Sequence, residues 1–169
     1  ALSGLPADLT VSTGPGATTA SALASWTAPA ATDNCPGVTL GSDFDPGDSF
    51  PLGVTTVTYT ARDAAGNATS QSFTVSVADD TEPVIALGTD LTVPNDAGQC
   101  AAVVGALGTS ASDNVGVTSL VAVRSDGAAF GDPFPAGVNS IAWIATDASG
   151  NTASAIQTII VNDAEAPAI

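Results

Sequence analysis

Phe50-Pro51-Leu52-Gly53-Val54 opens the stretch of sequence that decides the fold, and Asp63-Ala64-Ala65-Gly66-Asn67 closes it. The pattern returns as Phe134-Pro135-Ala136-Gly137-Val138 and Asp147-Ala148-Ser149-Gly150-Asn151, at a constant offset of 84 residues (134 − 50). A repeat of this length has the size of one small immunoglobulin-like β-sandwich. The chain of 169 residues therefore predicts two such repeats in tandem.

The residues between these motifs have the two-residue period of β-strands. Val57-Thr58-Tyr59-Thr60-Ala61 alternates apolar with polar residues, which predicts a strand with one buried face. The segment from Asp63 to Asn67 predicts a hairpin turn, with Gly66 at the position of positive φ. The alternation directs the large aromatic residues toward the cores, namely Tyr59, Phe73 and Trp143.

Two residues fit this repeat less simply. Trp26 is expected in an earlier strand, packed into the first core. Gln157 falls at the position of Phe73 in the first copy, which predicts either a slipped register or a half-exposed face at that point.

Small and β-branched residues dominate the composition. Aromatic residues make up 5% and charged residues 11%, and the chain contains 17 Gly and 11 Pro. This mix favours short strands joined by turns over long helices. We expect an all-β chain of two tandem immunoglobulin-like β-sandwiches arranged head to tail. The first repeat spans residues 1–79 and the second 80–162, and residues 163–169 begin the linker and first strand of a following repeat.

The charge of the chain is strongly negative. Seventeen acids face only Arg62 and Arg124, with no lysine or histidine, and the formal net charge is −15. Such a polyanion repels nucleic acid and anionic membrane surfaces, which excludes both as partners. Bound divalent cations would offset the self-repulsion. The alternative is a solvated acidic surface that maintains solubility or suits high salt, but the acids cluster at repeated positions, which favours cations.

The residue types that are missing argue against catalysis. Without histidine or lysine, most general-base, Schiff-base and zinc chemistry is excluded, and a catalytic triad lacks its base. We therefore expect no enzyme. No run of 18 apolar residues is present, which predicts no membrane-spanning segment. No signal peptide is present either, so Ala1 is expected to follow a cleavage or to begin a fragment.

The junction between the repeats reads Asp79-Asp80-Thr81-Glu82-Pro83 and carries three carboxylates with no cation beside them. It returns, altered, as Asp163-Ala164-Glu165-Ala166-Pro167, and the two glutamates of the chain lie in these two copies. Acids at both junctions predict a calcium-binding joint between consecutive sandwiches.

A composite motif runs from the first Asp-Asn pair to the first hairpin. It reads Thr32-Asp33-Asn34-Cys35, then Phe50-Pro51-x-Gly53-Val54-x-x-Val57-x-Tyr59-x-Ala61-x-Asp63-x-x-Gly66-Asn67. This motif resembles the hyalin repeat (HYR) family, as does Asp96-Ala97-Gly98-Gln99-Cys100 in the second copy, and the resemblance covers both repeats. It implies an immunoglobulin-like fold of extracellular, often long, multi-domain adhesion or matrix proteins, without enzymatic activity.

Calcium prefers six to eight oxygen ligands, and the loops near each junction are rich in them. In an immunoglobulin-like sandwich the B–C and F–G loops lie at the pole where the chain enters the domain. The ligands predicted at the joint between the two repeats are Asp79, Asp80, Glu82, Asp113, Asn114, Asp147 and Asn151. Those predicted at the joint with a preceding unit are Asp33, Asn34, Asp63, Asn67 and that unit's Asp163 and Glu165. Magnesium fits less well, because it demands strict octahedral geometry and retains water.

Turn chemistry alone offers another explanation for these motifs. Asp-x-x-Gly-Asn forms a stable hairpin, and Asp-Asn caps a loop without any ion. The acids of Asp43-Phe44-Asp45-Pro46-Gly47-Asp48 are expected to be solvated, although they are dense enough for a second, weaker site.

The two cysteines are expected at opposite ends of one unit, too far apart for a disulfide within the chain. Cys35 follows the first Asp-Asn pair, whereas Cys100 opens a strand of the second repeat. The equivalent positions at the middle junction, near Ala20 and Val115, carry no cysteine. We therefore predict a bridge from Cys100 of one unit to Cys35 of the next, in an oxidising extracellular setting. The alternative is two unpaired, buried thiols.

The ends of the chain are complementary in sequence. Joining Ile169 to Ala1 regenerates Ile-Ala-Leu, which occurs at Ile85-Ala86-Leu87 in the middle junction. We therefore expect one two-domain period of a longer array, or a mature chain whose end docks onto the next molecule. Either arrangement gives copies joined head to tail.

The function that follows is a structural repeat of an extracellular filament or stalk, with calcium at the joints for rigidity. The alternative is an adhesin segment or an accessory module that binds glycans or proteins. That alternative predicts exposed aromatic residues, whereas the strand pattern directs them inward.

Overall fold

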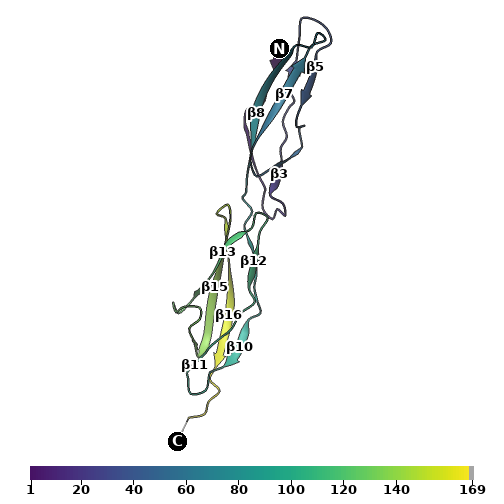
Figure 1. Ribbon diagram of the computed structural model, residues 1–169. Helices are drawn as coiled ribbons and strands as arrows, with labels where there is room; N and C mark the ends of the chain where they lie inside the picture. The colour runs from purple at the N-terminus through teal and green to yellow at the C-terminus, as the bar shows by residue number, and fades with distance from the viewer. Residues whose placement is uncertain (168–169) are drawn as a thin grey trace. The chain divides into compact units, whose positions relative to one another are not determined.

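The chain forms two compact units of β-structure, seen in a computed structural model that describes residues 1–167 (Figure 1). Unit 1 spans Ala1–Thr81 and unit 2 spans Glu82–Ile169. All regular secondary structure in the described residues is strand, as the composition predicts. The expected junction of Ile169 with Ala1 involves residues 168 and 169, which lie outside the described part.

Unit 1 contains eight strands. They are β1 (Leu2–Ser3), β2 (Leu9–Ser12), β3 (Ser21–Leu23), β4 (Ala30–Ala31), β5 (Thr39–Ser42), β6 (Ser49–Pro51), β7 (Gly53–Arg62) and β8 (Ala68–Ala78).

The main sheet of unit 1 has the order β2-β8-β7-β5. β2 runs parallel to β8, and the other neighbours are antiparallel. The second layer consists of two short pairs, β1 with β4 and β3 with β6. A sandwich in which an early strand pairs in parallel with the last strand is immunoglobulin-like. Glycine, proline and serine interrupt the second layer, which explains why it is fragmented.

The core of unit 1 is aromatic and lies between these layers. Phe50, Tyr59 and Phe73 are at most 4% exposed, as the alternation predicts for the strand residues. Trp26 packs edge-on against Phe73, with ring centroids 5.2 Å apart, and its Nε1 donates a hydrogen bond of 2.8 Å to the Tyr59 hydroxyl. Trp26 thus packs into the first core as expected, but it lies between β3 and β4 and not in a strand.

Unit 2 repeats this arrangement. Its strands are β9 (Val84–Ala86), β10 (Leu91–Pro94), β11 (Ala101–Ala102), β12 (Ser110–Ser112), β13 (Val117–Arg124), β14 (Phe134–Pro135), β15 (Gly137–Asp147) and β16 (Thr152–Asn162). The main sheet has the order β10-β16-β15-β13, with β10 parallel to β16, and the pairs β9–β12 and β11–β14 form the second layer.

Gln157 in β16 corrects the sequence prediction. It pairs with Ile141 as Phe73 pairs with Val57, so the register is unchanged, and it is 0% exposed. Its Oε1 accepts hydrogen bonds from Trp143 Nε1 (2.9 Å) and Thr109 Oγ1 (3.0 Å), and its Nε2 donates to the Thr89 carbonyl (2.9 Å). A buried amide is tolerated here because its donors and acceptors are used.

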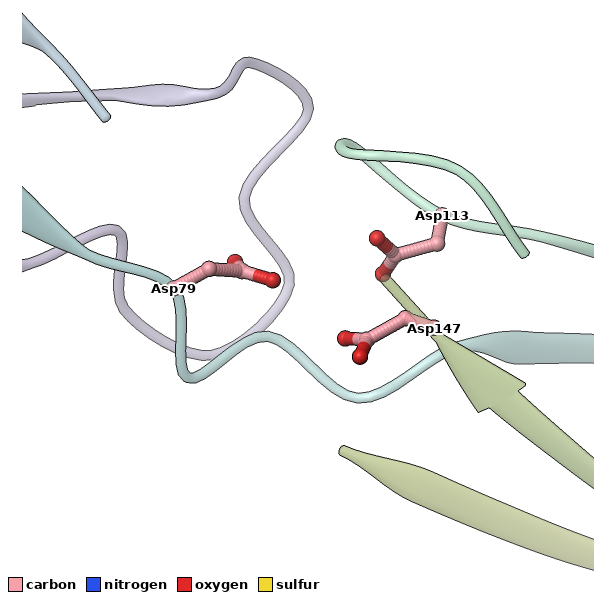
Figure 2. Close-up of side chains that lie close together, drawn as sticks. All are labelled: Asp79, Asp113 and Asp147. Atoms are coloured by element: carbon pink, nitrogen blue, oxygen red, sulfur yellow. The ribbon is translucent and has the colours of Figure 1, made fainter. Parts of the chain in front are cut away.

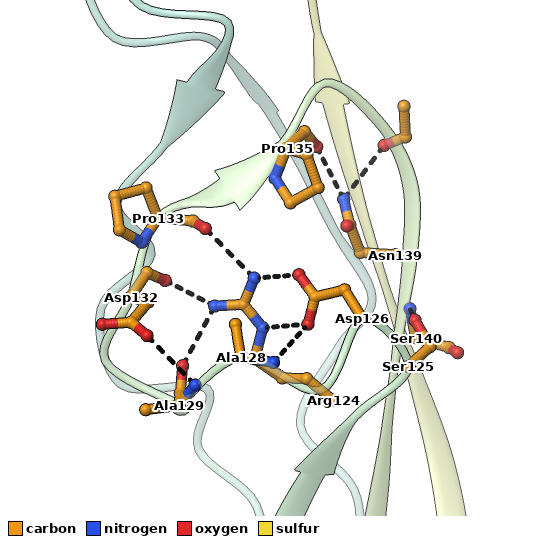
Figure 3. A network of polar contacts seen from close by, with 11 residues as sticks. Arg124, Ser125, Asp126, Ala128, Ala129, Asp132, Pro133, Pro135, Asn139 and Ser140 are labelled. Carbon is orange, nitrogen blue, oxygen red and sulfur yellow. Dashed lines mark hydrogen bonds and ion pairs between the residues drawn. The ribbon is translucent and has the colours of Figure 1, made fainter.

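Arg124, the last residue of β13, is buried with a side-chain exposure of 1%. Its guanidinium donates to both carboxylate oxygens of Asp126 and to the carbonyls of Ala129, Asp132 and Pro133 (Figure 3). The guanidinium carbon also lies 3.8 Å from the centre of the Phe134 ring. Five N–H donors therefore meet five acceptors, and they fix the loop between β13 and β14.

We predict that Arg124→Met lowers the free energy of unfolding of unit 2 by about 3–5 kcal/mol, because the substitution leaves Asp126 and three carbonyls without their buried donor. Urea unfolding followed by tryptophan fluorescence measures the loss. The chain's other arginine, Arg62, is exposed at the end of β7 and provides the control. Arg62→Met is expected to change the free energy by less than about 0.5 kcal/mol. Equal effects of the two substitutions would contradict the assignment.

Candidate metal-binding loops

Two loops of unit 2 meet at one end of its main sheet. Asp113 directly follows β12, and Asp147 is the last residue of β15. The pairing of Val117 with Asp147 brings the β12–β13 loop beside the β15–β16 turn. One carboxylate oxygen of Asp113 lies within 4.8 Å of one of Asp147, and Figure 2 shows the two side chains pointing into the same space. We call Asp113, Asn114, Asp147 and Asn151 the acidic loops of unit 2.

The Asp147 carboxylate organises the β15–β16 turn. Its Oδ1 accepts hydrogen bonds of 2.8 Å from the backbone N–H groups of Ser149 and Asn151, and its Oδ2 accepts one of 2.8 Å from Asn151 Nδ2. In the other loop, Asp113 Oδ2 accepts a bond of 2.9 Å from the Val115 N–H. Both acids therefore perform the turn-forming role that their motifs predict.

Turn formation does not neutralise the negative charge of these two acids. Asp147 is only 2% exposed, and Asp113 Oδ1 is buried without a hydrogen-bond partner among residues 1–167. No cationic side chain of unit 2 offsets them, because its one arginine is bound to Asp126. Two carboxylates so close together repel each other, and a buried unpaired oxygen is unfavourable. The donor set of carboxylates and amides fits a hard cation such as calcium.

The first residues of unit 2 approach the same loops. Val84 in β9 pairs with Ser112, which immediately precedes Asp113. Glu82 lies two residues before Val84 and is exposed. The chain therefore enters unit 2 at the acidic loops, as an immunoglobulin-like topology predicts.

Unit 1 builds equivalent loops from Asp33, Asn34, Asp63 and Asn67. Asp33 Oδ2 accepts a bond of 3.1 Å from the Cys35 N–H. Asp63 accepts bonds from Asn67, of 2.8 Å from the backbone N–H and 2.7 Å from Nδ2. Asp33, Asp63 and Asn67 line one shallow pocket. The two repeats thus place the same donor types at the same pole.

Asp79 and Asp80 hold the segment by which the chain leaves unit 1. Asp79 Oδ1 accepts a hydrogen bond of 2.7 Å from the Thr13 hydroxyl, and Asp80 Oδ1 accepts one of 2.7 Å from the Gly14 N–H. Thr81 Oγ1 donates to the Gly14 carbonyl at 2.9 Å. These acids are therefore engaged in local hydrogen bonds.

Asp163 and Glu165 hold the corresponding segment of unit 2. Both oxygens of Glu165 accept from the Gly98 N–H, at 2.8 and 3.0 Å, and Asp163 Oδ1 accepts from the Glu165 N–H at 3.1 Å. Gly14 and Gly98 are 84 residues apart (98 − 14), and both have positive φ, 82° and 71°. Neither glycine was predicted from the sequence as a partner of the acids, although their shared offset of 84 residues was the available signal.

Hydrogen bonds also hold two of the acids in their charged form. The Asn67 side-chain amide lowers the pKa of Asp63 below its ordinary range. The Ser12 hydroxyl and the Gly14 N–H lower the pKa of Asp80. Both side chains therefore stay ionised in mild acid, and a cation ligand must be ionised.

Both cysteines are exposed and form no disulfide within residues 1–167. Their exposure contradicts the alternative of two buried thiols. Cys100 corresponds to Ala20, because their carbonyls accept equivalent bonds from Ala136 and Leu52. The bridge between consecutive units stays a prediction.

Comparison with known proteins gives one family. The model of the HYR domain matches twice, at residues 10–77 and 78–161. The chain is 41% identical over 138 residues to Hyalin of Lytechinus variegatus, covering 79% of this chain and 26% of that protein. It is 38% identical over 141 residues to Hyalin of Strongylocentrotus purpuratus, covering 80% of this chain and 12% of that protein. The chain thus spans about a quarter or less of the length of these relatives.

Solved structures with similar folds are more distant. Human Protocadherin-24 EC1-2 matches with a TM-score of 0.41 and 18% identity, covering 96% of this chain and 99% of that one. The fibronectin(III)-like modules of Clostridium thermocellum CbhA match with a TM-score of 0.39 and 13% identity, covering 100% and 98%. In the described residues there is no helix long and apolar enough to cross a membrane.

We predict that Asn67→Ala raises the pKa of Asp63 toward its ordinary value, because the amide that favours the carboxylate is removed. Carboxyl carbon chemical shifts recorded from about pH 7 to about pH 2 measure the change. Since the folded-state pKa is lowered, the stabilisation is present above the ordinary pKa and is lost as the pH falls through the lowered one. Asp8, whose pKa is lowered by the Thr74 N–H, is the control in the same spectra. An unchanged Asp63 pKa would refute the assignment.

Proposed function

The chain belongs to the HYR domain family, and from that premise we propose that it is a repeating structural unit of an extracellular filament or stalk. Calcium binds at the joints between consecutive sandwiches and makes them rigid. The observation that carries this proposal is the pair Asp113 and Asp147, half-buried and buried respectively, whose carboxylates are crowded together without a cationic side chain. The proposed partners are further copies of the same unit, joined head to tail.

The middle joint combines the acidic loops of unit 2 with the acids just before them in sequence. We assign its calcium ligands among Asp79, Asp80, Glu82, Asp113, Asn114, Asp147 and Asn151. Asp113 Oδ1 is the strongest single candidate, since it is buried and unpartnered. Asp147 Oδ1 accepts two hydrogen bonds and Oδ2 accepts one, and because a carboxylate accepts about four in all, Oδ2 retains one acceptor site.

The joint between consecutive copies is built in the same way. Residues 163–169 begin the linker to the following repeat, and Asp163 and Glu165 face that repeat's loops. Those loops contain Asp33, Asn34, Asp63 and Asn67, which repeat the donor types of unit 2. A single chain therefore holds one complete joint and two half joints.

Calcium makes a joint more rigid because it neutralises the carboxylates there. Without metal, the carboxylates at a joint repel one another, and the domains on either side move independently. With metal, the shared ion links them and fixes their angle. The extracellular setting supports this role, because extracellular calcium modules work at roughly 0.1–1 mM.

We predict that the single chain binds calcium at one joint and that a fused chain of two copies binds at three. Isothermal titration calorimetry should therefore give calcium stoichiometries in a ratio of about one to three. At a hundredfold excess over Kd, calcium stabilises the folded state by about 2.7 kcal/mol, which raises Tm by roughly 10 °C or more for a domain of this size. EDTA should reverse both effects.

The test includes a matched pair of variants. Asp113→Asn is expected to weaken calcium binding at least tenfold. Asp90→Asn removes the same charge from unit 2 but lies outside the acidic loops, where Asp90 accepts a bond from the Thr158 N–H. It should bind calcium as the unmodified chain does. A chain with unchanged Tm and no calcium heat, or equal effects of both variants, refutes the metal joint.

We also propose the disulfide from Cys100 of one unit to Cys35 of the next. Both thiols are exposed, which such a bridge requires. We predict that the fused two-copy chain, oxidised and run on a non-reducing gel, migrates faster than after reduction. Cys35→Ser introduced into the second copy alone should abolish this shift, whereas the same change in the first copy should not. Free thiols at both central cysteines after oxidation would refute the bridge.

A role in glycan or protein binding has less support. Tyr59, Phe73 and Trp143 are buried in the two cores. The strands therefore offer no platform from these rings for stacking on a sugar.

A further inference from the structure

The outer face of the main sheet in unit 2 is apolar. Alternation along β13, β15 and β16 turns one set of side chains into the core and the other set outward. The outward set is Val121, Val123, Val138, Ala142, Ile144, Ile156 and Ile160. We call these residues the outer face of unit 2.

Most members of this face adjoin one another. Val121 pairs with Ile144 across the β13–β15 ladder. In the next row Val123 pairs with Ala142, and Ala142 pairs with Ile156. Side chains in such cross-strand rows touch, so these two rows form one patch. The pair of Val138 with Ile160 lies beyond one uncharged row of serine and threonine. Val121 is 50% and Ile156 67% exposed, so the patch is open to solvent in the isolated chain.

The fold does not require these residues to be apolar, as the equivalent face of unit 1 demonstrates. At the offset of 84 residues, Ile144 corresponds to Thr60, Ile156 to Ser72 and Ile160 to Ser76. Val121 corresponds to Gly41, since Leu40 pairs with Ala61 as Leu120 pairs with Ala145. Thr60 and Ser70 in fact bond to each other across that face, at 2.8 Å. Val138 is the exception, because it corresponds to Val54, which is also exposed. Two sheets of the same topology thus differ at most positions of this face.

The absence of charged residues from the outer face favours a second copy of the chain as its partner. The chain has a net charge of −15, yet the remaining outward positions of β15 and β16 are serine, threonine and, at the end of β16, Asn162, and none is charged. A basic partner would be attracted to the acidic surfaces elsewhere and not to this face. Two copies that meet through this face bury no carboxylate, so they avoid the desolvation of charge that other contacts between such acidic chains would entail.

The area of the face also matches a second copy. β15 and β16 are each 11 residues long and β13 is 8, so these three strands, spaced about 4.8 Å apart, give a surface on the order of 500 Å². Two such surfaces bury about 1,000 Å² in total, which is the threshold for a specific interface. One pair of units is therefore weak, and a series of them along two arrays is strong through multivalency.

We propose that the outer face of unit 2 is a lateral docking surface for the same face of a second copy. The two sheets pack back to back, and the contact is repeated once per two-domain period. The contact needs neither calcium nor a disulfide, and its test is therefore made in EDTA and reductant. Its failure would leave the calcium joint untouched.

We expect sedimentation equilibrium of the chain in about 0.5 M NaCl to show dimers with Kd on the order of 0.1–1 mM. Lowering the NaCl concentration should weaken the dimers, because the repulsion between the two negatively charged chains is then screened less. A fused two-copy chain should associate at least about tenfold more tightly. Concentration-dependent amide shifts should map to β13, β15 and β16.

The variant Ile144→Thr/Ile156→Ser introduces the residues that unit 1 carries at the same positions, so it preserves the fold. It should shift the chain to monomer at every concentration and leave Tm within a few degrees. The control Leu23→Thr/Val103→Thr removes two side chains of 72% and 63% exposure that lie outside the face, and it should dimerise normally. A monomeric wild-type chain in high salt refutes self-docking and assigns the face to another occupant. Dimers that survive the first variant refute it as well.

Discussion

The constraint on which the rest of the structure depends is a shortage of positive charge. Seventeen acids share two arginines, so side-chain ion pairs cannot neutralise them. Backbone N–H groups take the place of cationic side chains as partners of these acids. Asp8 accepts from the Thr74 N–H, Asp90 from the Thr158 N–H, and Glu165 from the Gly98 N–H. Each such bond fastens a loop to a strand or a turn, and a charged acceptor makes it stronger than a neutral one.

This use of acids determines where the remaining charge accumulates. Backbone N–H groups satisfy an acid that stands alone, but they do not relieve the repulsion between two acids in adjacent loops. Asp113 and Asp147 each cap their own turn and are still left within 4.8 Å of one another. Uncompensated negative charge therefore remains where the chain enters unit 2, and a divalent cation would offset it.

The sequence predicts what is local or periodic in the fold. Alternation defines β7, β8, β15 and β16, and the Asp-x-x-Gly-Asn turns follow from their own chemistry, with φ of 92° at Gly66 and 94° at Gly150. The offset of 84 residues then transfers each element from one repeat to the other. The acidic loops were predictable for the same reason, because the topology of the repeat places two loops at one pole.

The sequence fails where a polar side chain is buried because other polar groups converge on it. Gln157 is buried because Thr109 and Thr89 reach it from 48 and 68 residues away, which no local pattern records. Arg124 is buried because carbonyls of the following loop converge on it, and the loop conformation is itself a result of those bonds. Gln157 is thus buried by distant contacts and Arg124 by its own loop, and neither result follows from the polarity of the sequence pattern.

The two kinds of surface on unit 2 act on association in a coupled way. Its loops concentrate negative charge, whereas its outer face has none, so the proposed contacts along an array and between arrays would use different chemistry. They are linked through the net charge, because a cation bound at a joint lowers the repulsion that two arrays must overcome to bring their neutral faces together. Calcium can therefore favour lateral pairing without touching the paired faces. A single ion would then control both how stiff one array is and whether two arrays adhere.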